Sequence, residues 1–189
     1  MSARRDEYLL LYHCAPTLYK KKTASLFSLG GVDKIKLPYI INTYSRLVNS
    51  LDLKVTILCG CEKNTLVYVY NEKQLARILN APETSEFLKK YGYSGCRMVD
   101  EYIDVLRKRI ASSGVFPHEI GIFLDYPLYD VIGFIANGGK NFIHSGDWKV
   151  YHNKSGAVKK FNSYRACRRD VCRKLDSGLS ACEILKRVS

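Results

Sequence analysis

Two short segments hold the residues of this chain that are best suited to chemistry. The segment "HCAPTLYKKK" places His13 next to Cys14 and ends in three lysines, the last of which is Lys22. The segment "FPHEIGIF" places His118 next to Glu119, in front of an apolar run. A histidine transfers protons near neutral pH, a cysteine thiolate is a nucleophile, and a lysine ammonium attracts anions. These residue types suit either the binding of a small anionic ligand or thiol chemistry.

The element expected to position the first segment is a helix over residues 14–30. Pro16 suits the first helical turn, and Gly30 suits the position after the helix end. Lys22 then falls on the apolar face, where its side chain must extend toward water, pair with an acid or bind an anion. That apolar face is formed by Leu18, Ser25, Leu26 and Leu29.

The same helix would place Cys14 at its N-terminus, where the backbone dipole favours a thiolate. With His118 as the general base, Cys14 would be the nucleophile of a thiol-dependent enzyme. His13 is adjacent to Cys14 in the sequence, but the two side chains need not be in contact. The alternative is that Cys14 is a buried and unreactive cysteine.

The second segment is expected to precede a strand over residues 120–124. A histidine at the start of a strand, such as His118, suits a general base, but it can also simply hydrogen-bond a nearby backbone group. A little further on, Asp130 falls in the first turn of a predicted helix, where compensation of the helix dipole explains it. Gly133 in the middle of that helix predicts close packing against a neighbour.

The remaining pattern predicts an α+β fold, a single helix-rich domain over residues 1–189 with a β-hairpin and a few short strands. The hairpin is expected over 53–71, with its turn at 62–64, because two runs rich in β-branched and aromatic residues flank a polar turn there. A short strand is expected at 147–153. Helices are expected at 37–51, 71–79, 82–92, 98–110, 127–136, 155–175 and 179–187.

Metal and phosphate motifs are weak or missing. Cys59 and Cys61 would share one face of a strand, but no second pair of cysteines or histidines follows at ligand spacing, so no structural metal is expected. Cys167 and Cys172 lie about 140° apart around a helix and do not form a pair. No glycine-rich phosphate loop is present, and the residues do not identify a cofactor.

The charge is concentrated near the end of the chain. The net charge is +12, and residues 149–189 carry 11 basic and 3 acidic residues. In the helix expected at 155–175, an apolar face formed by Ala157, Phe161, Tyr164, Cys167, Val171 and Leu175 lies opposite Lys159, Arg165, Arg169 and Arg173. This pattern is typical of a helix packed on a domain. With no recognisable nucleic-acid motif, sequence-specific binding is not expected, and nonspecific nucleic-acid binding stays an alternative.

Composition points to a cytoplasmic protein without a membrane segment. No apolar run is long enough to span a bilayer, and the start of the chain lacks the apolar core of a signal peptide. Seven cysteines, an odd number scattered over a chain of this length, are expected to be free thiols in a reducing compartment.

Two phrases together resemble a known family. "HCAPTLYKKKTASLF", and "FPHEIGIFLDYPLYDVIGF" followed by "WKVY", are similar to uncharacterised proteins of anaerobic Gram-positive bacteria that share a domain of unknown function. The family phrase matches His13, Cys14, Pro16, Thr17, Leu18 and Lys22, with Ala15 where the family has serine. The resemblance implies a bacterial cytoplasmic protein and, through neighbouring flavodoxin genes, a redox protein partner. It implies no established reaction, ligand or fold.

The leading expectation is a pocket for a small anionic ligand or cofactor, lined by His13, Lys22, Ser25, His118 and Glu119. The thiol-dependent enzyme with Cys14 and His118 is the alternative, and nonspecific nucleic-acid binding is the third.

Overall fold

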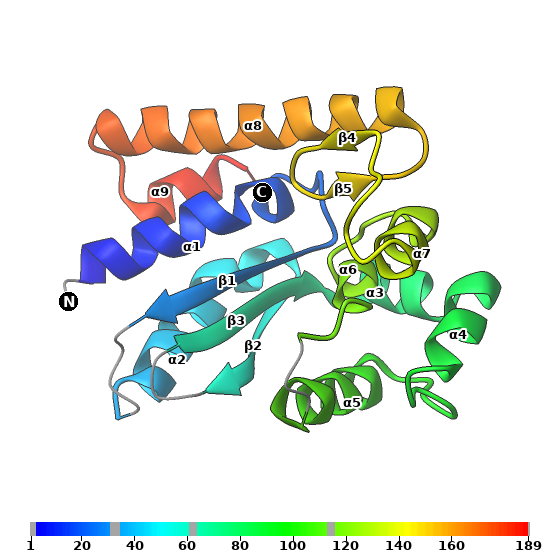
Figure 1. The fold of residues 1–189 in the computed structure, drawn as a ribbon. Helices are drawn as coiled ribbons and strands as arrows, with labels where there is room; N and C mark the ends of the chain where they lie inside the picture. Colours follow the sequence, from blue (N-terminus) through cyan, green and yellow to red (C-terminus); the bar gives the residue numbers. More distant parts are fainter. Residues whose placement is uncertain (1–2, 31–34, 61–63, 113–115, 189) are drawn as a thin grey trace. The chain divides into compact units, whose positions relative to one another are not determined.

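The computed structural model describes residues 3–30, 35–60, 64–112 and 116–188, which form two compact units. Unit 1 consists of Met1–Glu72 together with Ser163–Ser189, and unit 2 is Lys73–Asn162. Unit 2 is therefore an insertion in the sequence of unit 1. The elements, shown in Figure 1, are α1 (Ala3–Leu18), β1 (Ala24–Gly30), α2 (Leu37–Val48), η1 (Asn49–Leu51), β2 (Leu53–Gly60), β3 (Asn64–Asn71), α3 (Glu72–Leu79), α4 (Pro82–Lys89), α5 (Val99–Ser112), α6 (Ile120–Phe123), α7 (Leu128–Ala136), β4 (His144–Ser145), β5 (Lys149–Val150), α8 (Lys154–Asp176) and α9 (Ala181–Lys186).

Unit 1 is built on a three-stranded antiparallel sheet in the order β1-β3-β2. Phe27 of β1 and Ile57 of β2 both lie opposite Val67 of β3, and the register shifts between Ile57 and Cys59. Helices α1, α2 and α9 contact one another, and α1 and α2 also contact the strands. Alternate residues of each strand point to the same face, and those in the core cluster pack against these helices. The core cluster includes Leu10, Leu11, Phe27, Leu29, Tyr44, Val48, Leu53, Val67, Val69, Cys167, Val171, Ile184 and Leu185.

Unit 2 combines short helices with the two-stranded β4–β5 sheet, whose strand β5 contacts α7. Gly133 of α7 allows this contact, because a Cβ atom there would lie 2.5 Å from the ring of Tyr151. The expected close packing at Gly133 is therefore confirmed. Buried aromatic side chains fill the unit, among them Tyr93, Tyr102, Phe123, Trp148 and Phe161.

Several sequence predictions are confirmed. The fold is of the α+β class and rich in helices, β2 and β3 form the predicted hairpin, and α8 buries the predicted apolar face. The predicted turn of the hairpin lies mostly outside the described residues. That the whole chain behaves as one domain stays a prediction. None of the helices described is long and apolar enough to cross a membrane.

The predicted helix over 14–30 is wrong. The helix begins earlier, at Ala3, contains Pro16 near its end, and stops at Leu18 because Lys20 takes a left-handed backbone conformation with φ of 56°. Residues 24–30 then form β1, in which Phe27 and Leu29 are buried and Ser28 and Gly30 are exposed. That alternation has the two-residue period of a strand.

The predicted strand over 120–124 is also wrong, because Ile120–Phe123 form the short helix α6. All four of its residues are buried. A short apolar run that is buried on every side shows the same sequence pattern whether it forms a strand or a helix. Asp125, with φ of 63°, turns the chain after this helix toward α7.

Candidate functional site

Unit 2 contains a pocket of about 340 Å³, within the range of sites that hold small molecules. Its walls come from α6, α7 and the β4–β5 sheet, with His118 preceding α6. The residues that line it are His118, Ile120, Gly121, Tyr126, Asp130, Val131, Phe134, Ser145, Gly146, Trp148 and Lys149. We call it the aromatic pocket.

Flat ring systems shape the aromatic pocket. The rings of Tyr126 and Trp148 stack with centroids 5.0 Å apart and 27° between their planes. The imidazole of His118 meets the ring of Phe134 edge-on, also at 5.0 Å. Aromatic faces of this kind favour a flat and largely apolar ligand.

Lys149 supplies a positive charge at the wall. Its ammonium donates a hydrogen bond to the carbonyl oxygen of Gly139 at 2.6 Å and lies 5.7 Å and 5.0 Å from the ring centroids of Phe134 and Phe142. Within the described part of the chain, no carboxylate oxygen lies within ion-pair distance of this half-buried ammonium. A cation held by a carbonyl and aromatic faces retains attraction for an anion.

The acid in the pocket wall, Asp130, is occupied by its own hydrogen bonds. One carboxylate oxygen accepts the indole N–H of Trp148 at 2.7 Å, and the other accepts the backbone N–H groups of Tyr151 at 2.8 Å and His152 at 2.9 Å. The side chain is buried, with 3% of its surface exposed. From the sequence, Asp130 is explained by compensation of the helix dipole. That explanation is incomplete, because Asp130 also fixes the β5 region to α7.

A second cavity of about 210 Å³ also has His118 in its wall. It is lined by Tyr91, Arg109, Phe116, Pro117, His118, Glu119 and Ile135. We call it the arginine cavity. His118 is itself exposed and is the residue common to the two cavities.

Glu119, which also lines the arginine cavity, is buried and paired. It is 1% exposed and accepts two hydrogen bonds, one from the Nε of Arg109 and one from the hydroxyl of Tyr93 at 3.3 Å. The hydrogen bond that Arg109 donates to Glu119 raises the pKa of Arg109, while burial and the nearby carboxylate raise the pKa of Tyr93. The guanidinium of Arg109 also lies 5.4 Å from the ring centroid of Tyr91.

In unit 1 the structure brings together three residues singled out from the sequence: Cys14, Lys22 and Ser25. Ser25 in β1 is buried and shares a 2.8 Å hydrogen bond with the hydroxyl of Thr17. The Lys22 ammonium lies 5.8 Å from the ring centroid of Tyr164. The cluster is polar but closely packed, since Cys14, Thr17 and Ser25 are each at most 3% exposed.

The structural premise for a nucleophilic Cys14 is wrong. The residue lies near the C-terminal end of α1 rather than at a helix N-terminus. Burial raises the pKa of its thiol far above the usual range, and the opposing effects of the Lys22 charge and the Ser25 hydrogen bond are smaller. A neutral and inaccessible thiol is a poor nucleophile.

His13 lies apart from this buried cluster, on the exposed side of α1. Its imidazole stacks on Phe27 with centroids 5.5 Å apart and 4° between the planes. Partial burial, and then the charge of Arg168, lower its pKa. His13, Lys22 and Ser25 belong to unit 1 and His118 and Glu119 to unit 2, so a single site formed by all five stays a prediction.

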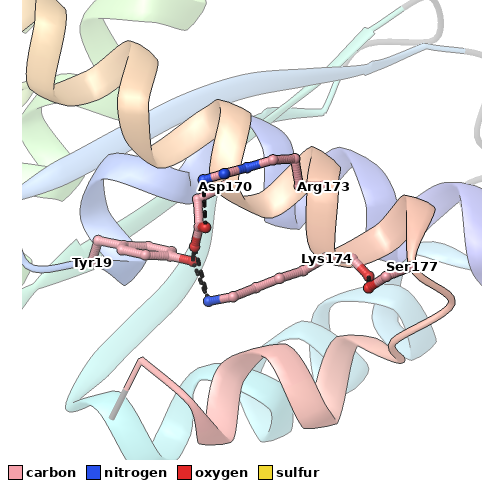
Figure 2. A network of polar contacts seen from close by, with 5 residues as sticks. All are labelled: Tyr19, Asp170, Arg173, Lys174 and Ser177. Carbon is pink, nitrogen blue, oxygen red and sulfur yellow. Dashed lines mark hydrogen bonds and ion pairs between the residues drawn. The ribbon is translucent and has the colours of Figure 1, made fainter.

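A polar network joins the end of α1 to α8 (Figure 2). The hydroxyl of Tyr19 donates to an oxygen of Asp170 at 2.6 Å, and the ammonium of Lys174 donates to the same hydroxyl at 3.0 Å. Lys174 also pairs with Asp170 at 2.9 Å, and Arg173 pairs with the other oxygen at 3.1 Å. The network holds α8 against the end of α1.

The described cysteines are free thiols, namely Cys14, Cys59, Cys96, Cys167, Cys172 and Cys182. Cys61 lies outside the described residues. Over the described ranges, no three His, Cys, Asp or Glu side chains are grouped closely enough to hold a metal ion.

Sequence reasoning missed the residues that form most of the aromatic pocket. The sequence pattern places Trp148 and Lys149 in a short strand and predicts no functional role for them or for Tyr126. The available signal was compositional, because the chain's only tryptophan lies beside a lysine in the phrase "WKVY".

Comparison with known proteins identifies the family. No curated protein and no solved structure matches the chain significantly. One family model, described as "Protein of unknown function (DUF3793)", matches residues 10–185. The match covers nearly the whole chain and agrees with the resemblance carried by the two phrases, so the protein belongs to the DUF3793 family.

Proposed function

We propose that the protein binds a small, flat, anionic ligand in the aromatic pocket of unit 2. The observation that carries the proposal is the half-buried ammonium of Lys149, at the wall of a pocket shaped by Tyr126, Phe134 and Trp148. Among the residues that the structure describes, this ammonium contacts a backbone carbonyl and aromatic rings and pairs with no carboxylate. Stacked rings accept the body of the ligand, and the ammonium attracts its negative group.

His118 gives the site a second polar contact. Its imidazole lies at the wall of both cavities, so it can hydrogen-bond a ligand in the aromatic pocket. The expected ligand role of His118 is therefore retained in the proposal. The expected contributions of His13, Lys22, Ser25 and Glu119 stay predictions, as do the cytoplasmic location and the redox protein partner.

The proposal is tested with a flat anion and its neutral isostere. Trans-cinnamate and cinnamamide have the same ring and length and differ in charge. Because Trp148 is the chain's only tryptophan and lies in the pocket wall, its fluorescence, excited at 300 nm, reports directly on occupancy. We expect cinnamate to bind about tenfold more tightly than the amide, as a charge-assisted hydrogen bond provides.

The variant Lys149→Met removes the ammonium while keeping an unbranched apolar chain. It should abolish the preference for cinnamate, whereas Lys140→Met, at an exposed position outside the pocket, should leave that preference unchanged. Equal affinity of the wild-type protein for both compounds would show that the pocket does not select anions. No fluorescence change with either compound would show that it does not take flat ligands.

A further inference from the structure

The aromatic pocket has a second polar side chain beside Lys149. Ser145 of β4 lies directly opposite Lys149 of β5 in the antiparallel register, and both residues line the pocket. Side chains that face each other across an antiparallel pair project from the same face, with Cβ atoms about 4.5–5.5 Å apart. Ser145 is exposed, so its hydroxyl is accessible to a ligand. The pocket therefore offers an ammonium and a hydroxyl side by side.

These two groups are held in place by the structure around the β4–β5 turn. The N–H of Gly146 donates a hydrogen bond to the carbonyl oxygen of Trp148 at 3.0 Å, which closes the turn. Gly146 also lies so near Phe161 that a Cβ atom there would be 2.3 Å from its ring. The Lys149 ammonium is held by the carbonyl oxygen of Gly139 at 2.6 Å. Because donors that are fixed before binding cost less to order, the two groups are suited to hold one ligand group together.

The charges of the lining favour a ligand with a single negative charge. The lining contains the ammonium of Lys149, the imidazole of His118 and the buried carboxylate of Asp130. The carboxylate stays in place, because it accepts three N–H groups and joins α7 to the β5 region. A dianion would be attracted by Lys149 but repelled by Asp130, and this repulsion grows with the charge of the ligand. A monoanion is repelled less.

The shape of the pocket favours a carboxylate over a tetrahedral anion. A carboxylate conjugated to a ring lies in the plane of that ring, whereas a sulfonate or phosphonate projects oxygens above and below it. The rings of Trp148 and Phe134 line the pocket and suit a ligand that is flat throughout. A carboxylate also accepts hydrogen bonds through two oxygens, one for the Lys149 ammonium and one for the Ser145 hydroxyl.

We propose that the aromatic pocket is a binding site for planar aromatic carboxylic acids, in which one carboxylate oxygen accepts a hydrogen bond from Lys149 and the other from Ser145. The body of the acid lies against Trp148 and Phe134. This assignment rests on the proposed function and deepens it, since it gives the chemical class of the anion and a specificity-determining residue, Ser145. Because both donors come from facing positions of one strand pair, the carboxylate is oriented as well as attracted.

The first experiment compares trans-cinnamate with trans-β-styrenesulfonate by isothermal titration calorimetry on the full chain. The two compounds share the ring, the double bond and a single negative charge, and they differ in the shape of the anionic group. Cinnamate should bind about tenfold more tightly, because the planar anion accepts hydrogen bonds from both donors while its ring stays against the aromatic walls.

The second experiment changes Ser145 and keeps the charge of Lys149. Ser145→Ala should weaken the binding of cinnamate about tenfold, which is the loss of one hydrogen bond to a charged group, and that of the neutral cinnamamide only about threefold. Ser145→Thr keeps a hydroxyl and should retain most of the affinity. The matched control is Ser94→Ala, at an exposed turn position of unit 2 outside the pocket, which should leave both affinities unchanged.

The outcomes separate this assignment from the proposed function. Binding of neither anion by the wild-type protein would overturn both. Equal affinity for cinnamate and styrenesulfonate, with both lost in Lys149→Met, would support the proposed function and overturn the carboxylate class. An unchanged affinity for cinnamate in Ser145→Ala, or an equal loss in Ser94→Ala, would overturn the role of Ser145.

Discussion

The carboxylate of Asp130 in α7 accepts the indole N–H of Trp148 at 2.7 Å, across 18 positions of the sequence. The same carboxylate binds two consecutive backbone N–H groups after β5. One buried acid thus joins two elements that line the aromatic pocket, α7 and the β5 region.

Asp130→Asn should destabilise the protein by about 3 kcal/mol. The amide has one oxygen in place of two and directs an NH₂ group toward existing donors, so buried N–H groups lose their acceptors at about 1–3 kcal/mol each. Urea unfolding followed by Trp148 fluorescence and by far-ultraviolet circular dichroism measures the change. Asp100→Asn, at an exposed position in α5, should cost less than about 0.5 kcal/mol. A similar cost for both variants would mean that the three hydrogen bonds contribute no net stability.

Arg109→Met should destabilise unit 2 by about 3 kcal/mol, because it leaves the buried carboxylate of Glu119 without its cation. The double variant Arg109→Met/Glu119→Met should be less destabilised than Arg109→Met alone, since no charge is then left buried. Arg107→Met breaks an exposed pair with Asp104 and should cost less than about 1 kcal/mol. Thermal unfolding of the four proteins ranks them, and a double variant less stable than the single one would contradict a purely structural pair.

Cys14 should react slowly with iodoacetamide in the folded protein at pH 7. Burial blocks access and raises the thiol pKa, and each unit of increase lowers the thiolate fraction about tenfold. The exposed Cys182 is the internal reference, and labelling in urea should bring both thiols to similar rates. Peptide mass spectrometry over a time course resolves them. Labelling of native Cys14 faster than Cys182 would instead support the thiol-dependent enzyme.

The contribution of Asp170 to stability should depend on pH. The hydrogen bond from Tyr19, followed by that from Lys174, lowers the pKa of Asp170, so its stabilisation is present above the unfolded-state pKa, near 4, and is lost as the pH falls through the lower folded-state value. Asp170→Asn should cost about 1 kcal/mol at pH 7. The difference from wild type should shrink toward pH 2. A difference that is constant between pH 7 and pH 2 would show that the carboxylate charge is irrelevant.

Elements with a long periodic pattern could be predicted from the sequence. Elements with a short pattern were predicted wrongly. The apolar faces of α2, α5 and α8 each extend over three turns or more, and the paired runs of β2 and β3 flank an evident turn. At 14–30, Pro16 predicts a helix start, but it lies in the last turn of a helix that begins at Ala3. The strand from Ala24 to Gly30 has only seven residues, too few for its alternation to stand out from the pattern that predicts a helix there.

The candidate site was only partly predictable, for a different physical reason. His118 was identified because a histidine before an apolar run is a local signal. Tyr126, Trp148 and Lys149 reach the same pocket through the turn at Asp125 and the hydrogen bonds of Asp130, which depend on tertiary contacts. The pairing of Glu119 with Arg109 likewise joins residues that the sequence alone does not connect.

The insertion of unit 2 within unit 1 has a consequence for biosynthesis. A ribosome that has completed β3 must add the whole of Lys73–Asn162, on the order of 5–20 s of elongation, before the rest of unit 1 exists. During that interval the nascent chain holds α1, α2 and the strands without Val171, Ile184 and Leu185, which complete their core. Unit 2 is contiguous in the sequence, so we expect it to fold before the core of unit 1 is complete.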